Sequence, residues 1–293
     1  MSFQTIILFL GWGVLAYFLY KLIRNFYNIL YPFVIATPKD LKVLAGANWA
    51  VVTGSTDGIG KAYALDLASR GFNIVLVSRT QQRLDDVRQE ILRKSSNVEV
   101  RTIKFDFTNA NLEDYKETIV KHLNGLDVGL LVNNVGMFFD YPDRFDKVPG
   151  GTKYIRDITI QMVPRNKGVV INISSSASHH TMRYLNIYSA AKKHVTWLTQ
   201  ILSKEFSDTG ITFQVVNAGM VATKMSKESE ALFVPSPETF VKQALNSVGH
   251  ISETNGCLVH EIEGLVWGLP DFLKDLLCDR VNLDKRENQM RQK

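Results

Sequence analysis

The sequence predicts an α/β fold in which helices cover both faces of a doubly wound parallel sheet of the Rossmann type. From Trp49 onward, short apolar runs alternate with stretches of helical periodicity. The apolar run Trp49–Val52 leads directly into the glycine-rich turn Thr53–Gly60, and that turn opens into a helical stretch over 61–70. The chain has 293 residues, 45% of them hydrophobic and 22% charged, so it can bury one large core in a single domain.

A strand, a glycine-rich turn and a helix in this order form a phosphate-binding element. The turn points free backbone N–H groups and the positive end of the helix at one place, where a pyrophosphate can bind. Glycine is expected at Gly54, Gly58 and Gly60 because a Cβ would block the tight turn and the close approach of phosphate oxygens. A glycine triplet alone also fits an ordinary turn, so the other motifs of the chain decide between the two.

The N-terminal residues 1–24 predict an uncleaved transmembrane anchor. Residues 3–20 carry no charge and are mostly apolar, and as a helix they would span ~27 Å. No Lys or Arg precedes Lys21, and no small-residue cleavage site follows, which argues against a signal peptide. Lys21 and Arg24 follow the apolar run, so the positive-inside rule places the rest of the chain in the cytosol. Residues 25–46 form a membrane-proximal linker, in which 29–35 are too few to span a membrane and are expected on its surface.

Beyond the glycine turn, each further element is predicted from its hydrophobic period. The strands are expected at Asn73–Ser78, 98–107, 129–135, 169–176 and 258–262, with helices at 80–94, at 112–123 and around Tyr188. The segment 223–237 is a substrate-covering loop or a plain solvated loop. Residues 265–277 are apolar at helical spacing and fit a lipid tunnel, a membrane contact or ordinary core. The main domain covers 47–262, and an apolar helix with a charged tail covers 263–293.

Composition excludes several functional classes. The two cysteines, Cys257 and Cys278, lie in no CxxC or Cys/His spacing, which argues against a metal site or a disulfide framework. A formal charge of +5 suits anionic lipid or a phosphorylated substrate, but spread evenly it is only a solubility feature. No basic tract is interleaved with aromatic residues, so nucleic acid is not an expected partner.

The end of the second predicted strand carries a cofactor signal. Ser78 and Arg79 stand there, with the arginine 19 positions after Gly60. An acidic residue at this distance would bind the 2′-hydroxyl of NAD, whereas an arginine suits the 2′-phosphate of NADP. We therefore expect NADP(H), with a plain surface arginine as the alternative. Asp106, after the third strand, could accept a hydrogen bond from the adenine amino group or form a turn.

Ser175, Tyr188 and Lys192 are the candidate catalytic residues. Tyr188 follows Ser175 by thirteen positions, and Lys192 follows four later on the same predicted helix. Residues i and i+4 share a helix face, so the phenol and the ammonium emerge side by side. A phenol with a pKa of about 10 is a poor acid or base at neutral pH, and an adjacent ammonium with an oxidised nicotinamide would favour phenolate. Ser175 would then hold the carbonyl or hydroxyl oxygen.

Over about residues 47–262, these motifs together resemble the short-chain dehydrogenase/reductases. They are the glycine turn TGxxxGxG, NNxG at 133–136, the Ser–Arg strand end, and a serine thirteen residues before YxxxK. The resemblance implies that Tyr188 is the acid/base, that Lys192 binds the nicotinamide ribose and lowers the tyrosine pKa, and that Ser175 positions the substrate. It also implies a cofactor site that consists of Gly54, Ser55, Asp57, Gly58, Ile59, Gly60, Ser78, Arg79, Asp106, Asn133, Lys192, Gly219, Val221 and Thr223.

The N-terminal anchor and the segments 137–142, 221–225 and 235–242 are similar to one branch of this family. That branch is the membrane-bound 17β-hydroxysteroid dehydrogenase group, which includes very-long-chain 3-oxoacyl-CoA reductase. The resemblance implies an NADP-dependent reductase of a lipophilic carbonyl, first a 17-ketosteroid, with a 3-oxoacyl-CoA of fatty acid elongation as the alternative. It implies an endoplasmic reticulum membrane protein that faces the cytosol, and it leaves a homodimer open.

Two features depart from the family pattern. After the sixth strand the family usually has Pro-Gly, whereas this chain has Ala218-Gly219. Between Asn134 and Ser175 the chain is shorter than this branch by about fifteen residues, roughly four helical turns. The missing stretch would contain an Asn of the proton relay and cover one face of the sheet, so its loss would expose apolar side chains. A cofactor-binding but catalytically impaired form, acting as a membrane partner protein, is therefore a second hypothesis.

Overall fold

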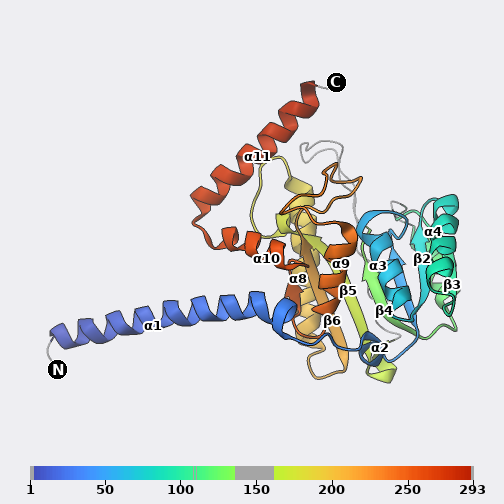
Figure 1. The fold of residues 1–293 in the computed structure, drawn as a ribbon, viewed down its shortest axis with the longest axis horizontal. Coiled ribbons are helices and arrows are strands. Elements are labelled where there is room, and N and C mark those ends of the chain that lie inside the picture. Colours follow the sequence, from blue (N-terminus) through green and yellow to red (C-terminus); the bar gives the residue numbers. More distant parts are fainter. Residues whose placement is uncertain (1–2, 108, 110, 136–161, 292–293) are drawn as a thin grey trace.

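Seven parallel strands form a single sheet in the computed structural model of the chain, in the order β3-β2-β1-β4-β5-β6-β7 (Figure 1). The structure describes residues 3–107, 109, 111–135 and 162–291. Because β1 lies between β2 and β4, the strand order reverses beside β1, and a crevice is expected there at the carboxyl ends of the strands. The predicted doubly wound α/β fold is confirmed.

The elements alternate along the chain as strand and helix. The strands are β1 (Trp49–Thr53), β2 (Asn73–Ser78), β3 (Val100–Lys104), β4 (Val128–Asn133), β5 (Gly168–Ser175), β6 (Ile211–Ala218) and β7 (Glu253–Thr254). The helices are α1 (Phe3–Leu30), α2 (Leu41–Ala45), α3 (Gly58–Ser69), α4 (Gln81–Lys94), α5 (Leu112–Tyr115), α6 (Lys121–Leu123), α8 (Asn186–Glu205), α9 (Pro237–Asn246), α10 (Leu258–Glu263) and α11 (Asp271–Arg291). Short π-helical or 3-10 segments cover Tyr31–Ile35, Lys116–Val120, Val163–Arg165, Ser176–Ser178 and Gly264–Gly268.

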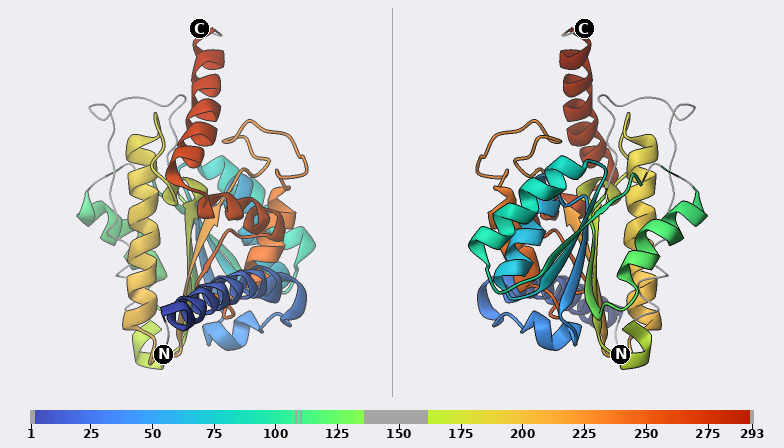
Figure 2. Two further views of the ribbon diagram at one scale, coloured as in Figure 1. Left: turned by 90° about the vertical axis from the view of Figure 1, so that its left-hand side faces the viewer. Right: turned by 90° about the vertical axis from the view of Figure 1, so that its right-hand side faces the viewer.

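Helices cover the two faces of the sheet in separate layers. Helices α3, α4 and α9 lie on one face, and α5, α6 and α8 lie on the other (Figure 2). All residues of β1 and β4 are buried, as expected for parallel strands that are covered on both faces. The apolar run at 49–52 is therefore a central strand, and its alternate residues contribute to two hydrophobic clusters, one on each face.

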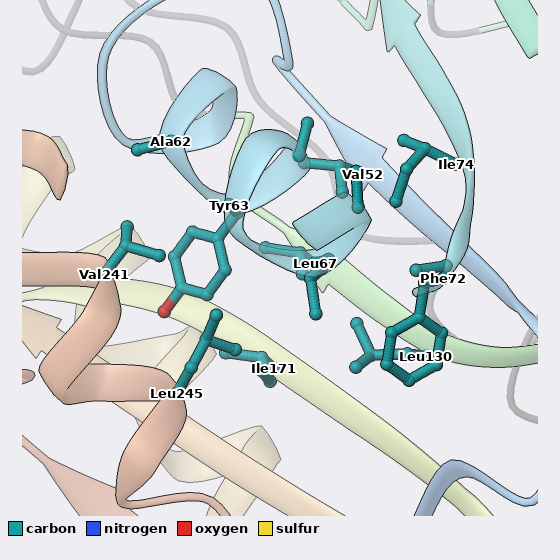
Figure 3. Close-up of a cluster of buried hydrophobic side chains, with 14 of the residues drawn as sticks. Val52, Ala62, Tyr63, Leu67, Phe72, Ile74, Leu130, Ile171, Val241 and Leu245 are labelled. Carbon is teal, nitrogen blue, oxygen red and sulfur yellow. The ribbon is translucent and has the colours of Figure 1, made fainter. Parts of the chain in front are cut away.

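The larger cluster lies between the sheet and the α3–α9 layer (Figure 3). Tyr63 of α3 is fully buried there, and its hydroxyl faces α9, which carries Val241 and Leu245 (Figure 3). That hydroxyl oxygen has no hydrogen-bond partner among the described residues. Burial raises the pKa of Tyr63, so the phenol remains neutral. The ring therefore contributes apolar contact area, whereas its hydroxyl is a polar group left without compensation.

The predicted final strand at 258–262 is wrong, because this stretch is helix α10. The five residues Leu258–Ile262, three of them apolar, fit a strand or a helix equally well, and only their flanks distinguish the two. Here Gly256 has a φ of +90° and Cys257 is extended, after which the N–H of Glu261 donates to the carbonyl of Cys257. The last strand of the sheet is instead the short β7, which lies just before this turn. The apolar run at 265–277 is divided at Pro270 into a 3-10 segment and α11.

At the N-terminus, α1 forms one continuous helix of 28 residues (Figure 1). Within the described part of the chain, no helix combines the length and the apolarity needed to cross a membrane, so the predicted transmembrane anchor at 1–24 is not confirmed. The segment expected on a membrane surface, 29–35, is the end of α1 and a π-helical turn with Pro32 buried. Residues 151–160, which by the family resemblance begin the long helix after the fourth strand, lie outside the described residues. The sequence predicts that the shortened stretch leaves apolar side chains exposed on one face of the sheet. On the face covered by α5, α6 and α8, Leu131 and Val170 are fully buried.

Replacement of Tyr63 by Phe should stabilise the protein by about 0.5–2 kcal/mol, because it removes a buried hydroxyl that has no partner in the described structure. Tyr63→Ala is the matched control, and it should cost about 3–5 kcal/mol through the cavity that it leaves. Urea unfolding of the three proteins measures both differences. A Tyr63→Phe protein that is less stable than wild type would show that the hydroxyl has a favourable interaction.

Candidate active site

The glycine turn between β1 and α3 has the geometry of a phosphate cradle. Gly54 and Gly58 adopt φ values of +64° and +51°, which residues with a Cβ rarely adopt. A Cβ on Gly60 would overlap the carbonyl of Gly54, so α3 can approach the turn only with glycine there. Asp57 caps α3, and its carboxylate accepts a hydrogen bond from the N–H of Gly58 at 2.9 Å. The helix N-terminus is thereby fixed at the edge of the crevice.

Asn134, which follows β4, holds the glycine turn in place. Its side-chain amide donates to the carbonyls of Thr53 at 3.1 Å and Gly54 at 3.3 Å, while its backbone N–H donates to the Thr53 hydroxyl at 3.0 Å. The predicted cofactor residue Asn133 points elsewhere: it is 6% exposed and donates to Asn172 of β5 at 2.7 Å. Asn134 is thus a site residue that the sequence reasoning missed, although the NNxG motif contains it.

The predicted ribose side of the site lies where β2 ends beside the glycine turn. The hydroxyls of Thr56 and Ser78 lie 3.0 Å apart, so the turn and the strand end are joined directly. Ser55 is fully buried with its hydroxyl against the carbonyl of Val77, which makes it a structural part of the turn. Arg79 is exposed immediately after β2, and Asp106 is exposed in a turn after β3, where its carbonyl accepts from the N–H of Asn109.

The three candidate catalytic residues come together at the end of β5. Tyr188 and Lys192 lie on α8, with the lysine Nζ 5.8 Å from the tyrosine ring centroid, and Ser175 hydrogen-bonds the tyrosine side chain. The ammonium of Lys192 donates to the carbonyl of Ile173 at 3.0 Å. The structure therefore brings together the serine, phenol and ammonium that the sequence spacing predicts, on adjoining elements.

Burial controls the protonation of this set. Burial raises the pKa of Tyr188, and the hydrogen bond with Ser175 opposes this rise without cancelling it. A lowering of the tyrosine pKa by Lys192 together with oxidised nicotinamide stays a prediction. The neutral phenol that results is the form able to donate a proton. Burial also lowers the pKa of Lys192 to about 8, so its ammonium is held at a cost.

A buried polar network attaches α8 to the sheet. The hydroxyl of Ser174 donates to the carbonyl of Lys192 at 2.8 Å and lies 2.8 Å from the hydroxyl of Thr196. Thr196 donates to Asn217 of β6 at 2.9 Å, and Asn217 donates to Glu253 of β7 at 2.8 Å. Because these bonds are directional and shielded from water, they fix the position of α8 along β5. The network was not predicted, since serine and threonine on a helix give no periodic signal.

The segment after β6 reaches the glycine turn from the opposite side. Thr223 lies so close to Gly58 that a Cβ on that glycine would be 3.1 Å from the threonine methyl. Lys224 forms an ion pair of 3.0 Å with Asp57. Burial acts to raise the pKa of Asp57, but the bonds from Lys224 and from the N–H of Gly58 outweigh it and lower the pKa. A hollow of about 720 Å³ adjoins this contact, and neither Ser175 nor Tyr188 is among the described residues that line it.

The loop between β5 and α8 is held by the C-terminal part of the chain. His180 lies 2.8 Å from Asp275 of α11, and Arg183 pairs with Asp279 at 2.9 Å. His179 hydrogen-bonds Asn255 at 3.2 Å. The two histidines therefore join this loop to segments that are distant in the sequence. The i, i+4 spacing of the two aspartates on α11 is the signal that could have identified this contact.

Comparison with known proteins identifies the class that this geometry defines. Residues 48–232 match the family model for the short-chain dehydrogenases, and the chain belongs to that family. It is therefore an oxidoreductase by family, and some solved structures of similar fold are complexes with NADPH. The predicted resemblance is confirmed.

Two nematode proteins are similar to this chain over nearly their whole length. A very-long-chain 3-oxoacyl-CoA reductase of Caenorhabditis elegans is 45% identical over an alignment that covers 100% of this chain and 98% of the relative. A protein of the same organism named "Putative steroid dehydrogenase 1" is 46% identical, with 94% of this chain and 93% of the relative covered. The first alignment spans 310 positions, more than the 293 residues present here, as a shortened chain requires.

Similarity extends to a human protein and to solved structures. The human very-long-chain 3-oxoacyl-CoA reductase is 38% identical over 96% of this chain and 94% of the relative. A short-chain dehydrogenase from Sphingobium yanoikuyae in complex with NADPH has a TM-score of 0.56 at 26% identity, covering 65% of this chain and 80% of that one. A structure of a 7β-hydroxysteroid dehydrogenase has a TM-score of 0.67 at 21% identity, covering 78% and 94%, which supports the fold.

Replacement of Lys192 by Met should increase stability at pH 7 by about 1–3 kcal/mol, because the folded protein no longer holds a buried ammonium. In the unfolded chain this lysine keeps its proton to a pH of about 10.4, whereas in the folded protein it releases it near 8. Wild-type stability should therefore rise between these pH values, and the gap to the variant should close.

Urea unfolding at several pH values from 7 to 10 measures the Lys192 effect. Lys193→Met is the matched control, because Lys193 is exposed on the same helix, and its stability should stay within about 0.5 kcal/mol of wild type at each pH. A Lys192→Met protein that is less stable than wild type at pH 7 would contradict the inference that burial disfavours the ammonium.

Proposed function

We propose that the protein is an NADP(H)-dependent reductase of a lipophilic carbonyl compound. The observation that carries the proposal is the contact of Ser175 with the neutral phenol of Tyr188, on the same helix as Lys192 and beside the glycine turn. A hydroxyl and a phenol on one carbonyl oxygen supply a positioning hydrogen bond and a proton. The family membership supports oxidoreductase chemistry at this set.

The residues present fit a nicotinamide dinucleotide. A Cβ on Gly58 would lie 3.1 Å from the Thr223 methyl, so glycine leaves the backbone at the start of α3 without a side chain there. Glycine at Gly60 lets α3 pack closely against the Gly54 carbonyl. We propose that this N-terminus holds the pyrophosphate and that Arg79 binds a 2′-phosphate. When bound, the cofactor supplies a hydride to the carbonyl carbon. The similarity to a structure in complex with NADPH supports the choice of NADP(H).

The chain's own residues would complete the reduction on the oxygen side. Ser175 and Tyr188 would donate hydrogen bonds to the substrate oxygen, and Tyr188 would transfer its proton as negative charge develops there. Lys192 would bind the ribose and replace the lost proton of the phenol from its ammonium. Its pKa of about 8 lies close to neutral pH, so the proton can be returned at little cost.

We favour a 3-oxoacyl-CoA as the substrate, with a 17-ketosteroid as the second candidate. The full-length similarity to reductases of the worm and of man, both named for very-long-chain 3-oxoacyl-CoA, supports the first. The equally similar worm protein named as a steroid dehydrogenase supports the second. Exposed apolar side chains of the segment after β6, namely Met225, Leu232 and Phe233, suit either lipophilic molecule.

NADPH oxidation by the purified chain should be faster with long-chain 3-oxoacyl-CoA than with 17-ketosteroids, and faster than NADH oxidation. Tyr188→Phe should lower kcat by at least about 100-fold with little change in NADPH affinity, because it removes only the proton donor. The matched control is Tyr184→Phe, just before α8, which should retain activity. NADPH binding without turnover on any ketone would contradict the reductase and favour the impaired form.

We further propose that α1 attaches the protein to the cytosolic face of the endoplasmic reticulum membrane. Leu8, Phe9 and Trp12 are 64%, 65% and 63% exposed on this helix, and Lys21 and Arg24 follow them. Large apolar side chains left in water favour contact with a lipid surface, and nearby cations favour anionic lipid. The exposed apolar side chains and the two basic residues that follow them support membrane attachment through α1.

Vesicles that contain anionic lipid should float the wild-type protein in a density gradient. Replacing Phe9 and Trp12 together by Asp should lower the vesicle-bound fraction at least about tenfold, because each aromatic contributes ~1.5–3 kcal/mol when buried. The matched control replaces Phe272 and Leu276 of α11, which are equally exposed, and should float as wild type does. Equal loss of binding in both pairs would contradict a specific role of α1.

A further inference from the structure

A buried histidine that was not among the predicted site residues contacts the backbone that follows β6. His260 of α10 is 2% exposed. Its ring packs against Gly219, where an added Cβ would be 3.0 Å from the ring. The N–H of Gly219 donates to His260 Nδ1 at 3.4 Å, and His260 Nε2 lies 3.1 Å from the carbonyl of Met220. One imidazole therefore contacts the backbone of two consecutive residues, Gly219 and Met220.

The two contacts define the state of the ring. Nδ1 accepts a hydrogen bond from a backbone N–H, so it carries no proton, and Nε2 faces a carbonyl, so it carries one. Only the neutral imidazole with its proton on Nε2 satisfies both. An aromatic ring of the same size without nitrogens would fill the space but would leave the buried N–H and carbonyl without these partners.

The backbone that contacts His260 lies between Ala218, the last residue of β6, and Val221, whose carbonyl accepts a hydrogen bond from Ser226. Ala218 has no proline ring to fix its φ, and Gly219 has no side chain to pack. The turn leads into Val221, which is 3% exposed, and then into Thr223 beside Gly58 of the glycine turn. A shift of the Gly219 peptide would therefore move Thr223 relative to the pyrophosphate site.

Helix α10, which carries His260, is itself held in place by contacts with β7 and α9. The carboxylate of Glu261 accepts hydrogen bonds from the hydroxyl of Thr254 at 2.8 Å and from the Asn255 amide at 2.8 Å. The ring of Phe240 of α9 lies 5.6 Å from the imidazole and closes its other side. Because the helix is tied to the end of β7 and packed against α9, the imidazole is fixed before any ligand binds.

We propose that His260 is a positioning residue for the cofactor: its neutral imidazole holds the turn 218–221 in the conformation that sets Thr223 against the glycine turn. The inference rests on the proposed function, because it takes the crevice between Thr223 and Gly58 as the cofactor site. His260 contacts neither cofactor nor substrate in this role. It acts through two backbone hydrogen bonds, each of which can change an affinity by a factor of about five.

NADPH affinity of purified variants, measured by fluorescence titration without substrate, tests the proposal. His260→Phe keeps the ring and loses both bonds, so the NADPH Kd should rise at least about tenfold. His260→Asn retains an acceptor near Nδ1, and His260→Gln retains a donor near Nε2, so each should raise Kd by only about threefold. At saturating NADPH, kcat should stay within about twofold of wild type for all three, because Ser175 and Tyr188 are unchanged.

His250→Phe is the matched control, because His250 also bonds a backbone carbonyl, that of Thr37, away from the glycine turn. Its Kd for NADPH should equal that of wild type. If His260→Phe binds NADPH as wild type does while both phenylalanine variants lose thermal stability alike, His260 is only structural and the proposal is overturned. Equal Kd values for the Phe, Asn and Gln variants would overturn the role of the hydrogen bonds.

The experiment also separates this inference from the proposed function. Wild type that binds NADPH but reduces no ketone would contradict the reductase, while the Kd series would still decide the role of His260. Wild type that binds no NADPH would overturn both. If His260→Phe does not fold, the Asn and Gln variants still decide the question, because each retains one of the two bonds and must differ from wild type in Kd.

Discussion

The close approach of α3 to the ends of β1 and β4 is the constraint on which the rest of the structure depends. It requires glycine at Gly60, where a Cβ would overlap the Gly54 carbonyl, and it requires the amide of Asn134 across the two strands. Helix and strands meet here at the point where the strand order reverses. Glycine leaves the backbone without side chains at Gly54, Gly58 and Gly60, which is the condition that the proposed phosphate site at the start of α3 would need.

The catalytic half of the site depends on a different kind of restraint. Apolar packing alone would allow α8 to slide on β5, because hydrophobic contacts have little direction. The chain from Ser174 through Thr196 to Asn217 is directional, and it links the helix carbonyl at Lys192 to a neighbouring strand. A shift by one helical turn would break every bond in it. This chain of hydrogen bonds requires several polar groups to be buried. It holds Tyr188 in a single position relative to Ser175.

Sequence periodicity predicted the strands of the sheet well, because fully buried parallel strands form apolar runs bounded by turns. Asn73–Ser78 matches the observed β2 at both ends. It failed at 258–262, where five residues are too few to show a hydrophobic period and the stretch after Gly256 forms a helix. The motif spacing placed Ser175, Tyr188 and Lys192 correctly. It could not find Asn134 or His260 as supports, because their roles depend on contacts between segments distant in the sequence.

The two sides of the site also differ in how they tolerate change. The cofactor side is built from sheet packing and close glycine contacts, where almost any added atom would overlap the backbone. On the side where the substrate is proposed to bind, α11 is held to the loop between β5 and α8 by ion pairs such as Arg183 with Asp279. Exposed ion pairs contribute little and can be exchanged without disturbing the core. Segments attached in this way can diverge between similar chains while the core of the fold stays the same, which is consistent with the two kinds of names among the relatives of this chain.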